Sequence, residues 1–210
     1  MKCLVVVAHP DDEIIWMGGV FLRHPQWDWH IVSLCRADDD DRAPRFQLSA
    51  KTIGATALIS DLDDSSPILA PLSPDLNEIK RRISLLALHK PDLIFTHGKT
   101  GEYTRHMRHE QVHRAVCDMV DSGDIAGELI FFAYDDCGGE RRPQPLANAD
   151  ITLTLFDEEY TKKRKIIRDI YGFRPGSFEY DASGPVEGFH IRSSGISIDQ
   201  FKTIIQNSDN

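Results

Sequence analysis

The sequence has no excess of basic residues. It contains 24 Lys and Arg against 33 Asp and Glu, which gives a formal net charge of −9. Proteins that bind nucleic acid need a basic footprint to neutralise phosphates. This balance therefore disfavours nucleic acid as a partner, and it weighs against a strongly anionic membrane surface. We expect a small-molecule partner, and the sequence leaves a homo-oligomer open.

Long apolar runs and paired cysteines are also missing. The apolar run near the N-terminus is far too short to span a bilayer and meets charged residues at once, so we expect no membrane span, no signal peptide and a cytoplasmic protein. Cys3, Cys35, Cys117 and Cys137 show no Cys-x-x-Cys spacing. Free thiols are the simplest interpretation.

No linker or repeat divides the 210 residues, of which 41% are hydrophobic. A chain of this size can bury a core of its own. We therefore expect one domain over residues 1–210, with an α/β core over about 1–170. A C-terminal loop and short helix segment is expected over about 171–210.

Apolar strand-like segments alternate with helix-like segments along the chain. The expected strands are 2–7, 29–35, 57–60, 92–96 and 128–134, with 151–155 as a further candidate. The expected helices are 13–23, 42–53, 74–90, 108–121 and 157–170, with a short one from Asp199. Such alternation predicts an α/β fold, a mostly parallel sheet with helices on both faces.

The most informative motif is Ala8 to Glu13, Ala-His-Pro-Asp-Asp-Glu, which directly follows the first apolar strand. In a tight turn, His9 and Asp12 can face the same point and offer a nitrogen and an oxygen to a zinc ion. Asp11 is then left free, and Glu13 suits the start of a helix. For Asp-Asp-Glu alone, an acidic helix N-cap beside a surface histidine is the preferred explanation, so a second motif is needed.

That second motif follows the strand that ends at Thr96. His106, His109 and His113 fall within eight residues, and His109 and His113 would share one face of a helix. His109 can complete the set of three protein ligands that a catalytic zinc needs. The other histidines considered, His24, His30, His89 and His97, are interpreted as surface or capping residues.

With Gly18-Gly19 and the later His-x-x-His, these motifs resemble those of the PIG-L/LmbE-like family of zinc-dependent N-acetylglucosaminyl deacetylases. The resemblance implies a Rossmann-like fold, with His9, Asp12 and His109 as zinc ligands. It implies Asp11 as general base and His106 as the residue that assists the tetrahedral intermediate. Whether His106 acts in its protonated form is left open.

The resemblance continues beyond the two motifs. Arg42 with Ile53-Gly54 looks like the family's Arg-bearing helix, and 187–189 like its C-terminal Glu-x-Phe. Arg42 is therefore an expected substrate-binding residue. So is Tyr103, which lies three residues before His106, whereas the family often has a tyrosine two residues before this histidine. The chain departs from the family's usual His-Pro-Asp-His by having Met107 and Arg108 between the histidines, so we expect Glu110 to supply the acidic partner of an imidazole.

Two acidic runs, 38–41 and 61–64, follow the second and third expected strands. We favour solvated loops for both. The alternative is an acidic rim that disfavours phosphorylated substrates and tolerates an amine, although Arg36, Arg42 and Arg45 nearby would reduce its field.

These observations predict a metal-dependent deacetylase that hydrolyses an N-acylated amine, an N-acetylglucosamine-type sugar by resemblance. Zn²⁺ is the expected cofactor, and another divalent metal such as Fe²⁺ fits the same ligands. An amidase acting on another N-acyl or thiol conjugate would share every motif residue. A non-catalytic metal- or nucleotide-binding module is disfavoured, because the first strand is not followed by Gly-x-Gly-x-x-Gly.

Overall fold

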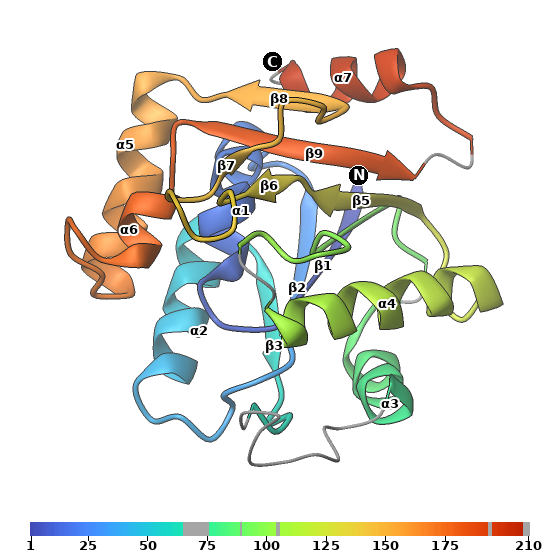
Figure 1. Cartoon of the computed structure of the whole chain (residues 1–210). Helices are drawn as coiled ribbons and strands as arrows, with labels where there is room; N and C mark the ends of the chain where they lie inside the picture. The colour runs from blue at the N-terminus through green and yellow to red at the C-terminus, as the bar shows by residue number, and fades with distance from the viewer. Residues whose placement is uncertain (65–75, 89, 104–105, 193–194, 208–210) are drawn as a thin grey trace.

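The computed structural model describes residues 1–64, 76–88, 90–103, 106–192 and 195–207 (Figure 1). Its main sheet has seven strands in the order β3-β2-β1-β4-β5-β9-β8. Strands β1 to β5 run parallel, and β9 runs antiparallel to both of its neighbours. The strands of this sheet are β1 (Lys2–Val7), β2 (Asp28–Ser33), β3 (Thr56–Ile59), β4 (Leu93–Thr96), β5 (Glu128–Phe132), β8 (Ile151–Thr154) and β9 (Val186–Arg192).

Helices cover both faces of the sheet (Figure 1). They are α1 (Asp12–Arg23), α2 (Arg42–Ile53), α3 (Leu76–Leu86), α4 (Met107–Ser122), α5 (Asp157–Lys165), α6 (Phe178–Ala182) and α7 (Ile198–Gln206). A π-helical turn, η1 (Ile166–Ile170), continues α5, and a small hairpin is formed by β6 (Tyr134–Asp135) and β7 (Gln144–Pro145). The α/β fold class predicted from the sequence is confirmed. No helix of the described part is long and apolar enough to cross a membrane.

Strand β1 lies at the centre because both of its faces are apolar. Cys3, Val5 and Val7 enter the core that packs under α1, α2 and α5, whereas Leu4 and Val6 enter the core under α3 and α4. Side chains alternate along a strand, so a continuous apolar run suits a strand that is covered on both faces.

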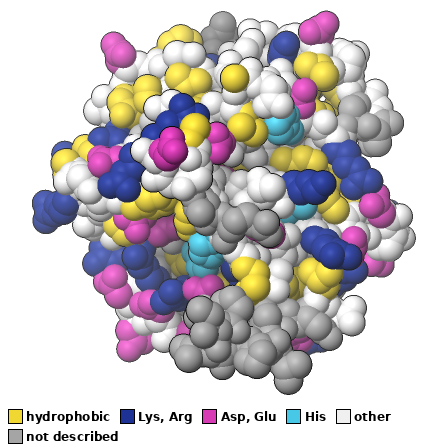
Figure 2. All heavy atoms as spheres, in the orientation of Figure 1, with side chains coloured by type: hydrophobic (Ala, Val, Ile, Leu, Met, Phe, Trp, Pro, Cys, Tyr) yellow, Lys and Arg dark blue, Asp and Glu magenta, His cyan; other side chains and the backbone are white. Residues whose placement is uncertain are grey.

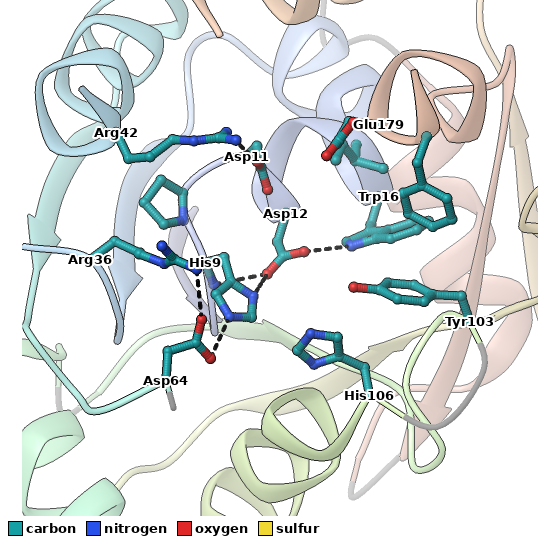
Figure 3. A pocket seen from close by; sticks show the side chains of 13 residues that line it. His9, Asp11, Asp12, Trp16, Arg36, Arg42, Asp64, Tyr103, His106 and Glu179 are labelled. Atoms are coloured by element: carbon teal, nitrogen blue, oxygen red, sulfur yellow. Dashed lines mark hydrogen bonds and ion pairs between the residues drawn. The ribbon is translucent and has the colours of Figure 1, made fainter. Parts of the chain in front are cut away.

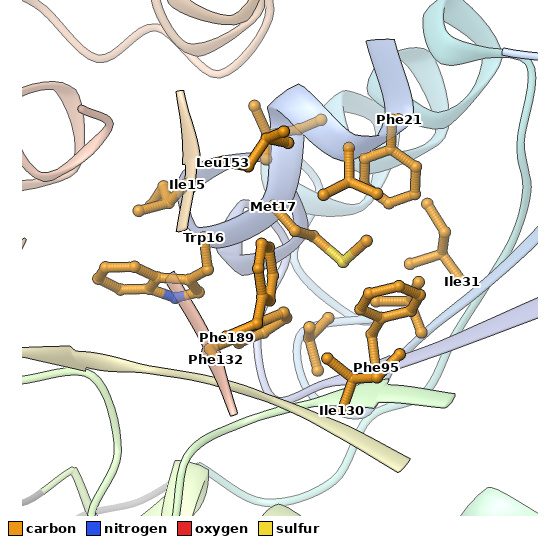
Figure 4. Packing of buried hydrophobic residues seen from close by; sticks show 14 of the residues in the cluster. Ile15, Trp16, Met17, Phe21, Ile31, Phe95, Ile130, Phe132, Leu153 and Phe189 are labelled. Carbon is orange, nitrogen blue, oxygen red and sulfur yellow. The ribbon is translucent and has the colours of Figure 1, made fainter. Parts of the chain in front are cut away.

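The larger of the two cores is rich in aromatic side chains (Figure 4). Trp16 and Phe21 come from α1, whereas Phe95 comes from β4, Phe132 from β5 and Phe189 from β9. All five side chains are fully buried or nearly so. Trp16 therefore has its ring anchored in the core while its indole N–H reaches the turn that follows β1.

Helix α1 is interrupted at Met17, and the break is stabilised by a buried carboxylate. Glu187 on β9 accepts hydrogen bonds from the backbone N–H groups of Gly19 (2.7 Å) and Val20 (3.2 Å). Lys163 pairs with the same carboxylate at 2.7 Å. A Cβ on Gly19 would lie 2.6 Å from Leu155. The Gly18-Gly19 pair therefore serves close packing within a helix and does not form a phosphate-binding turn.

The region after Tyr171 differs from its expected loop. It contributes α6 and the long strand β9, which extends the sheet past β5. Strand β9 follows a Gly- and Pro-containing turn and begins Val-Glu-Gly-Phe. Glu187 occupies a buried position of this strand, so the sequence lacks the alternation of apolar residues that would predict a strand. The other expected elements are found within a few residues of their predicted bounds, although the strand expected to reach Tyr134 is divided into β5 and β6.

Strand order reverses between β1 and β4, because β2 and β3 lie on one side of β1 and β5 lies beyond β4. In open α/β sheets, the carboxyl ends of strands at such a reversal leave a crevice that binds ligands. His9 follows β1 and His97 follows β4, so both motifs meet at this crevice.

Candidate metal centre

The turn after β1 is fixed by its own backbone. Asp11 has a φ of 112°, a conformation that costs a non-glycine residue about 1–3 kcal/mol. In exchange its carbonyl accepts the N–H groups of Ile14 and Ile15, at 3.0 and 2.9 Å, and starts helix α1. The backbone N–H of His9 donates to Asp12 at 2.8 Å. The motif therefore delivers both predicted ligands in one rigid turn.

Three donor atoms meet at this turn. Nδ1 of His9 lies 3.4 Å from Oδ2 of Asp12. Nε2 of His109 lies 3.3 Å from that nitrogen and 3.4 Å from that oxygen. A tetrahedral zinc with bonds of about 2.0–2.1 Å requires neighbouring ligand atoms to lie about 3.3–3.4 Å apart. The donor set and its spacing therefore fit zinc.

Glu102 orients the His109 imidazole. Its Oε2 accepts from Nδ1 of His109 at 2.5 Å, which leaves Nε2 facing the other two donor atoms. We expected Glu110 to be the acidic partner; the structure gives this role to Glu102, in the loop before α4. Metal-bound histidines commonly have such a carboxylate on their second nitrogen.

His97 is buried beside His109, and its interpretation as a surface or capping residue is wrong. The two rings stack at 3.9 Å. Nε2 of His97 accepts the N–H of Ala8 at 2.9 Å, and its Nδ1 donates to Glu102 at 3.0 Å. Burial lowers the pKa of His97. Because its one lone pair is already used, His97 holds the ligands in place and is not itself free to bind a metal.

Asp64 performs for His9 the role that Glu102 performs for His109. Its carboxylate lies 3.0 Å from Nε2 of His9 and 3.1 Å from a guanidinium nitrogen of Arg36. Arg108, buried at the start of α4, donates to the carbonyl of Asp63 and so holds the same loop. At Asp64, therefore, the acidic run 61–64 is not the solvated loop that we favoured.

The two neighbouring aspartates have opposite electrostatics. Burial, reinforced by the charge of Asp12, raises the pKa of Asp11 well above its usual value, and Arg42, at 2.9 Å, opposes the rise. Burial also acts against the charge of Asp12, but His109 and His9 hold the pKa of Asp12 well below its usual value. Asp12 is thus a permanent anion, whereas Asp11 is suited to exchange a proton.

Glu13 supports this turn from below. Its carboxylate accepts from the N–H of Asp11 at 2.9 Å, from Tyr171 at 2.5 Å and from Ser49 at 3.2 Å. Burial raises the pKa of Glu13 to about 7. Tyr171 thereby ties the C-terminal segment to the turn that carries the candidate site.

His106 lies at the N-cap of α4, with its ring 4.1 Å from that of His109. Burial and the positive charge of His109 lower the pKa of His106 to about 3. This shift favours a neutral His106 ring in the metal-free protein. Its buried Nδ1 has no hydrogen-bond partner among the described residues.

A cavity of about 240 Å³ opens above these groups (Figure 3). Trp16, Tyr103 and Phe178 form an aromatic wall: the Trp16 and Tyr103 rings stack at 6.2 Å, and Tyr103 meets Phe178 edge-on at 4.7 Å. Arg42 and Tyr103, the expected substrate-binding residues, both line this cavity. Sequence reasoning missed Trp16, although its position four residues after Asp12 places both on one face of α1.

The remaining histidines take other positions. His24 is fully buried and stacks on Trp27 at 3.9 Å, so its interpretation as a surface or capping residue is wrong. His30 is half-buried and contacts the carbonyl of Leu86. His113 donates to the carbonyl of His97 at 2.8 Å, away from the three donor atoms. His89 lies outside the described residues.

Fold and site together define a hydrolytic deacetylase. The chain belongs to the PIG-L family, described as GlcNAc-PI de-N-acetylase, whose family model matches residues 4–120. The predicted family is thereby confirmed. No curated protein matches the chain.

Solved structures share the fold at low identity. A conserved protein from Thermus thermophilus has a TM-score of 0.63 and 17% identity, with 93% of this chain and 96% of that chain covered. The N,N'-diacetylchitobiose deacetylase of Pyrococcus horikoshii, in complex with an inhibitor, has a TM-score of 0.59 and 17% identity, with coverages of 90% and 83%. A zinc-inhibited form of the teicoplanin deacetylase Orf2 has a TM-score of 0.58 and 11% identity, with coverages of 93% and 100%.

Proposed function

We propose that this chain is a zinc-dependent deacetylase that removes an acetyl group from an N-acetylglucosamine-type sugar. The observation that carries the proposal is the triangle of donor atoms from His9, Asp12 and His109, with edges of 3.3–3.4 Å, beside a cavity that His9 and Asp12 line. The family's description and the chitobiose deacetylase of similar fold support an N-acetyl sugar as substrate. The neighbour in a zinc-inhibited form supports zinc as a metal that such folds bind.

When bound, zinc supplies Lewis acidity. Asp11 is the proposed general base, because its carboxylate lines the cavity beside the ligand Asp12 and is not itself one of the three donors. Asp11 takes a proton from the attacking water and passes it to the leaving amine. Arg42 keeps the Asp11 carboxylate in place through the 2.9 Å ion pair.

His106 is the proposed oxyanion-stabilising residue. Its ring lines the cavity beside the donor atoms, and its Nδ1 lacks a partner among the described residues. A neutral imidazole N–H can donate to the oxyanion of the tetrahedral intermediate. Tyr103, which stacks on the buried Trp16, offers a flat apolar surface that suits the C–H face of a sugar ring.

The test is acetate release from N-acetylglucosamine glycosides, followed for zinc-loaded protein, chelated protein and chelated protein with zinc or Fe²⁺ restored. We expect turnover with zinc, loss on chelation and recovery on reloading. A panel of N-acyl thiol conjugates tests the other substrate class. If the loaded protein releases acetate from no N-acetyl sugar, the proposed substrate is wrong.

A further inference from the structure

The cavity wall contains one charged side chain for which the described part of the chain offers no partner. The charged residues of the wall are Asp11, Asp12, Arg36, Arg42, Asp64 and Glu179. Both arginines are already paired with carboxylates, Arg42 with Asp11 at 2.9 Å and Arg36 with Asp64 at 3.1 Å. Within the described ranges, no hydrogen bond or ion pair involves the carboxylate of Glu179. In Figure 3 it lies on the side of Trp16 and Tyr103, across the cavity from the arginines.

Helix α6 holds Glu179 in this position. Ser177 caps the helix by accepting the N–H of Tyr180 at 3.3 Å. The guanidinium of Arg164 lies 3.3 Å above the Tyr180 ring and donates to the carbonyl of Tyr180. Phe178 packs against Tyr103 at 4.7 Å. The neighbours of Glu179 on both sides are thus anchored, and its carboxylate is left facing the cavity.

This arrangement discriminates between charges. An anionic group on the substrate would meet the carboxylate of Glu179 and would have to break an existing ion pair to reach either arginine. A cationic group would gain the Glu179 carboxylate as a partner. The repulsion between an anionic substrate group and this carboxylate would add to the specificity. On the face shown in Figure 2, acidic and basic side chains are interspersed.

We propose that Glu179 is a specificity-determining residue that selects N-acyl amino sugars bearing a positively charged amine close to the N-acyl group. Phosphorylated or carboxylated analogues are disfavoured. This inference rests on the proposed deacetylase function, because it assumes that the sugar occupies the same cavity.

The experiment uses three matched derivatives of N-acetylglucosamine that carry an ethyl, 2-aminoethyl or carboxymethyl group. One series carries the group at O1, as a glycoside, and the other carries it at O6, as an ether. Acetate release gives kcat/KM, and calorimetric titration into the zinc-loaded protein gives Kd. Both are measured at low salt for the wild type, Glu179→Gln and Glu158→Gln. Glu158 is a matched control because it is an exposed carboxylate on α5 that does not line the cavity.

In at least one series we expect the wild type to favour the 2-aminoethyl over the carboxymethyl derivative by about twofold to fivefold, the size of one partly exposed ion pair. Glu179→Gln should abolish this ratio, and Glu158→Gln should retain it. The inference is overturned if the preference for the 2-aminoethyl derivative is the same in the wild type and in Glu179→Gln. It is also overturned if the wild type prefers the carboxymethyl derivative. If no acetate is released but Kd still shows a preference that Glu179→Gln removes, the deacetylase proposal fails and the charge selection stands.

Discussion

Oδ1 of Asp64 lies 3.0 Å from Nε2 of His9, on the edge of the imidazole that faces away from Asp12 (Figure 3). When His9 is neutral and Nε2 donates to this carboxylate, the lone pair of Nδ1 is directed at the other two donor atoms. The loop that carries Asp64 thus fixes the tautomer and the orientation of a proposed metal ligand, although it lies 55 residues away in the sequence.

Asp64→Ala should weaken metal binding without unfolding the protein. Loss of such a carboxylate typically lowers metal affinity by about 10–100-fold. Competition with a chelator of known affinity measures the change. Asp61→Ala is the matched control, because Asp61 lies in the same loop but pairs with Arg82 at the surface. Equal affinities for Asp64→Ala and Asp61→Ala would show that Asp64 does not orient the ligand.

Metal binding should release protons. Burial opposes their charge, but hydrogen bonds to Asp12 and Asp64 raise the pKa of His9 to about 9, and Asp12 and Glu102 raise the pKa of His109 to about 10. Both histidines are therefore protonated in the metal-free protein at pH 7, and ligation requires their unprotonated form. Titrations in buffers of different ionisation enthalpy should show release of about two protons per metal; a release near zero contradicts this.

The same two histidines determine how the stability of the metal-free protein varies with pH. A histidine whose pKa is raised on folding stabilises the folded state fully below its unfolded pKa of about 6.5 and loses this contribution as pH rises through its folded pKa. The Tm of metal-free protein should therefore fall between about pH 7 and pH 10. The Tm increase caused by zinc should grow over the same window. Thermal melts with and without zinc measure both trends, and an increase that shrinks with pH would be the wrong sign.

Glu187→Ala should destabilise the fold strongly. It leaves the ammonium of Lys163 buried without its partner and removes the acceptor of two backbone N–H groups in α1. Breaking a buried pair in this way costs about 3–5 kcal/mol. Urea unfolding measures the loss. Glu158→Ala breaks an exposed pair with Lys162 and should leave the free energy of unfolding nearly unchanged; equal losses for the two variants would refute the role of burial.

Asp11→Asn separates the base from the ligands. The amide keeps the shape of the carboxylate but cannot accept the proton of the water, so turnover should fall by about 10²-fold or more while zinc is retained. Metal content and acetate release are measured on the same preparation. Near-normal turnover with full zinc would show that Asp11 only starts helix α1.

The sequence predicted those parts of the site that depend on local order. His9, Asp11 and Asp12 follow a buried strand directly, and His109 lies on a helix with a clear pattern, so their positions follow from strand ends and helix spacing. Glu102 and Asp64 were missed as ligand-orienting residues because their roles depend on which loops meet after folding. His97 was misjudged because nothing adjacent to it shows that Ala8 and Glu102 would satisfy both of its nitrogens.

The fold shows the same division. The apolar runs predicted the central strands. Strand β9 was missed because it pairs antiparallel with β5 and β8, which are distant in the sequence, and because it carries Glu187 at a buried position. The single domain over 1–210, the cytoplasmic location and the oligomeric state stay predictions.

The central claim is that His9, Asp12 and His109 hold the metal. Anomalous diffraction at the zinc edge, from crystals of the zinc-loaded protein, tests it most directly. We predict one strong peak about 2.0–2.2 Å from Nδ1 of His9, a carboxylate oxygen of Asp12 and Nε2 of His109. A peak bound by His97 in place of His9, or no peak among these three side chains, would contradict the account.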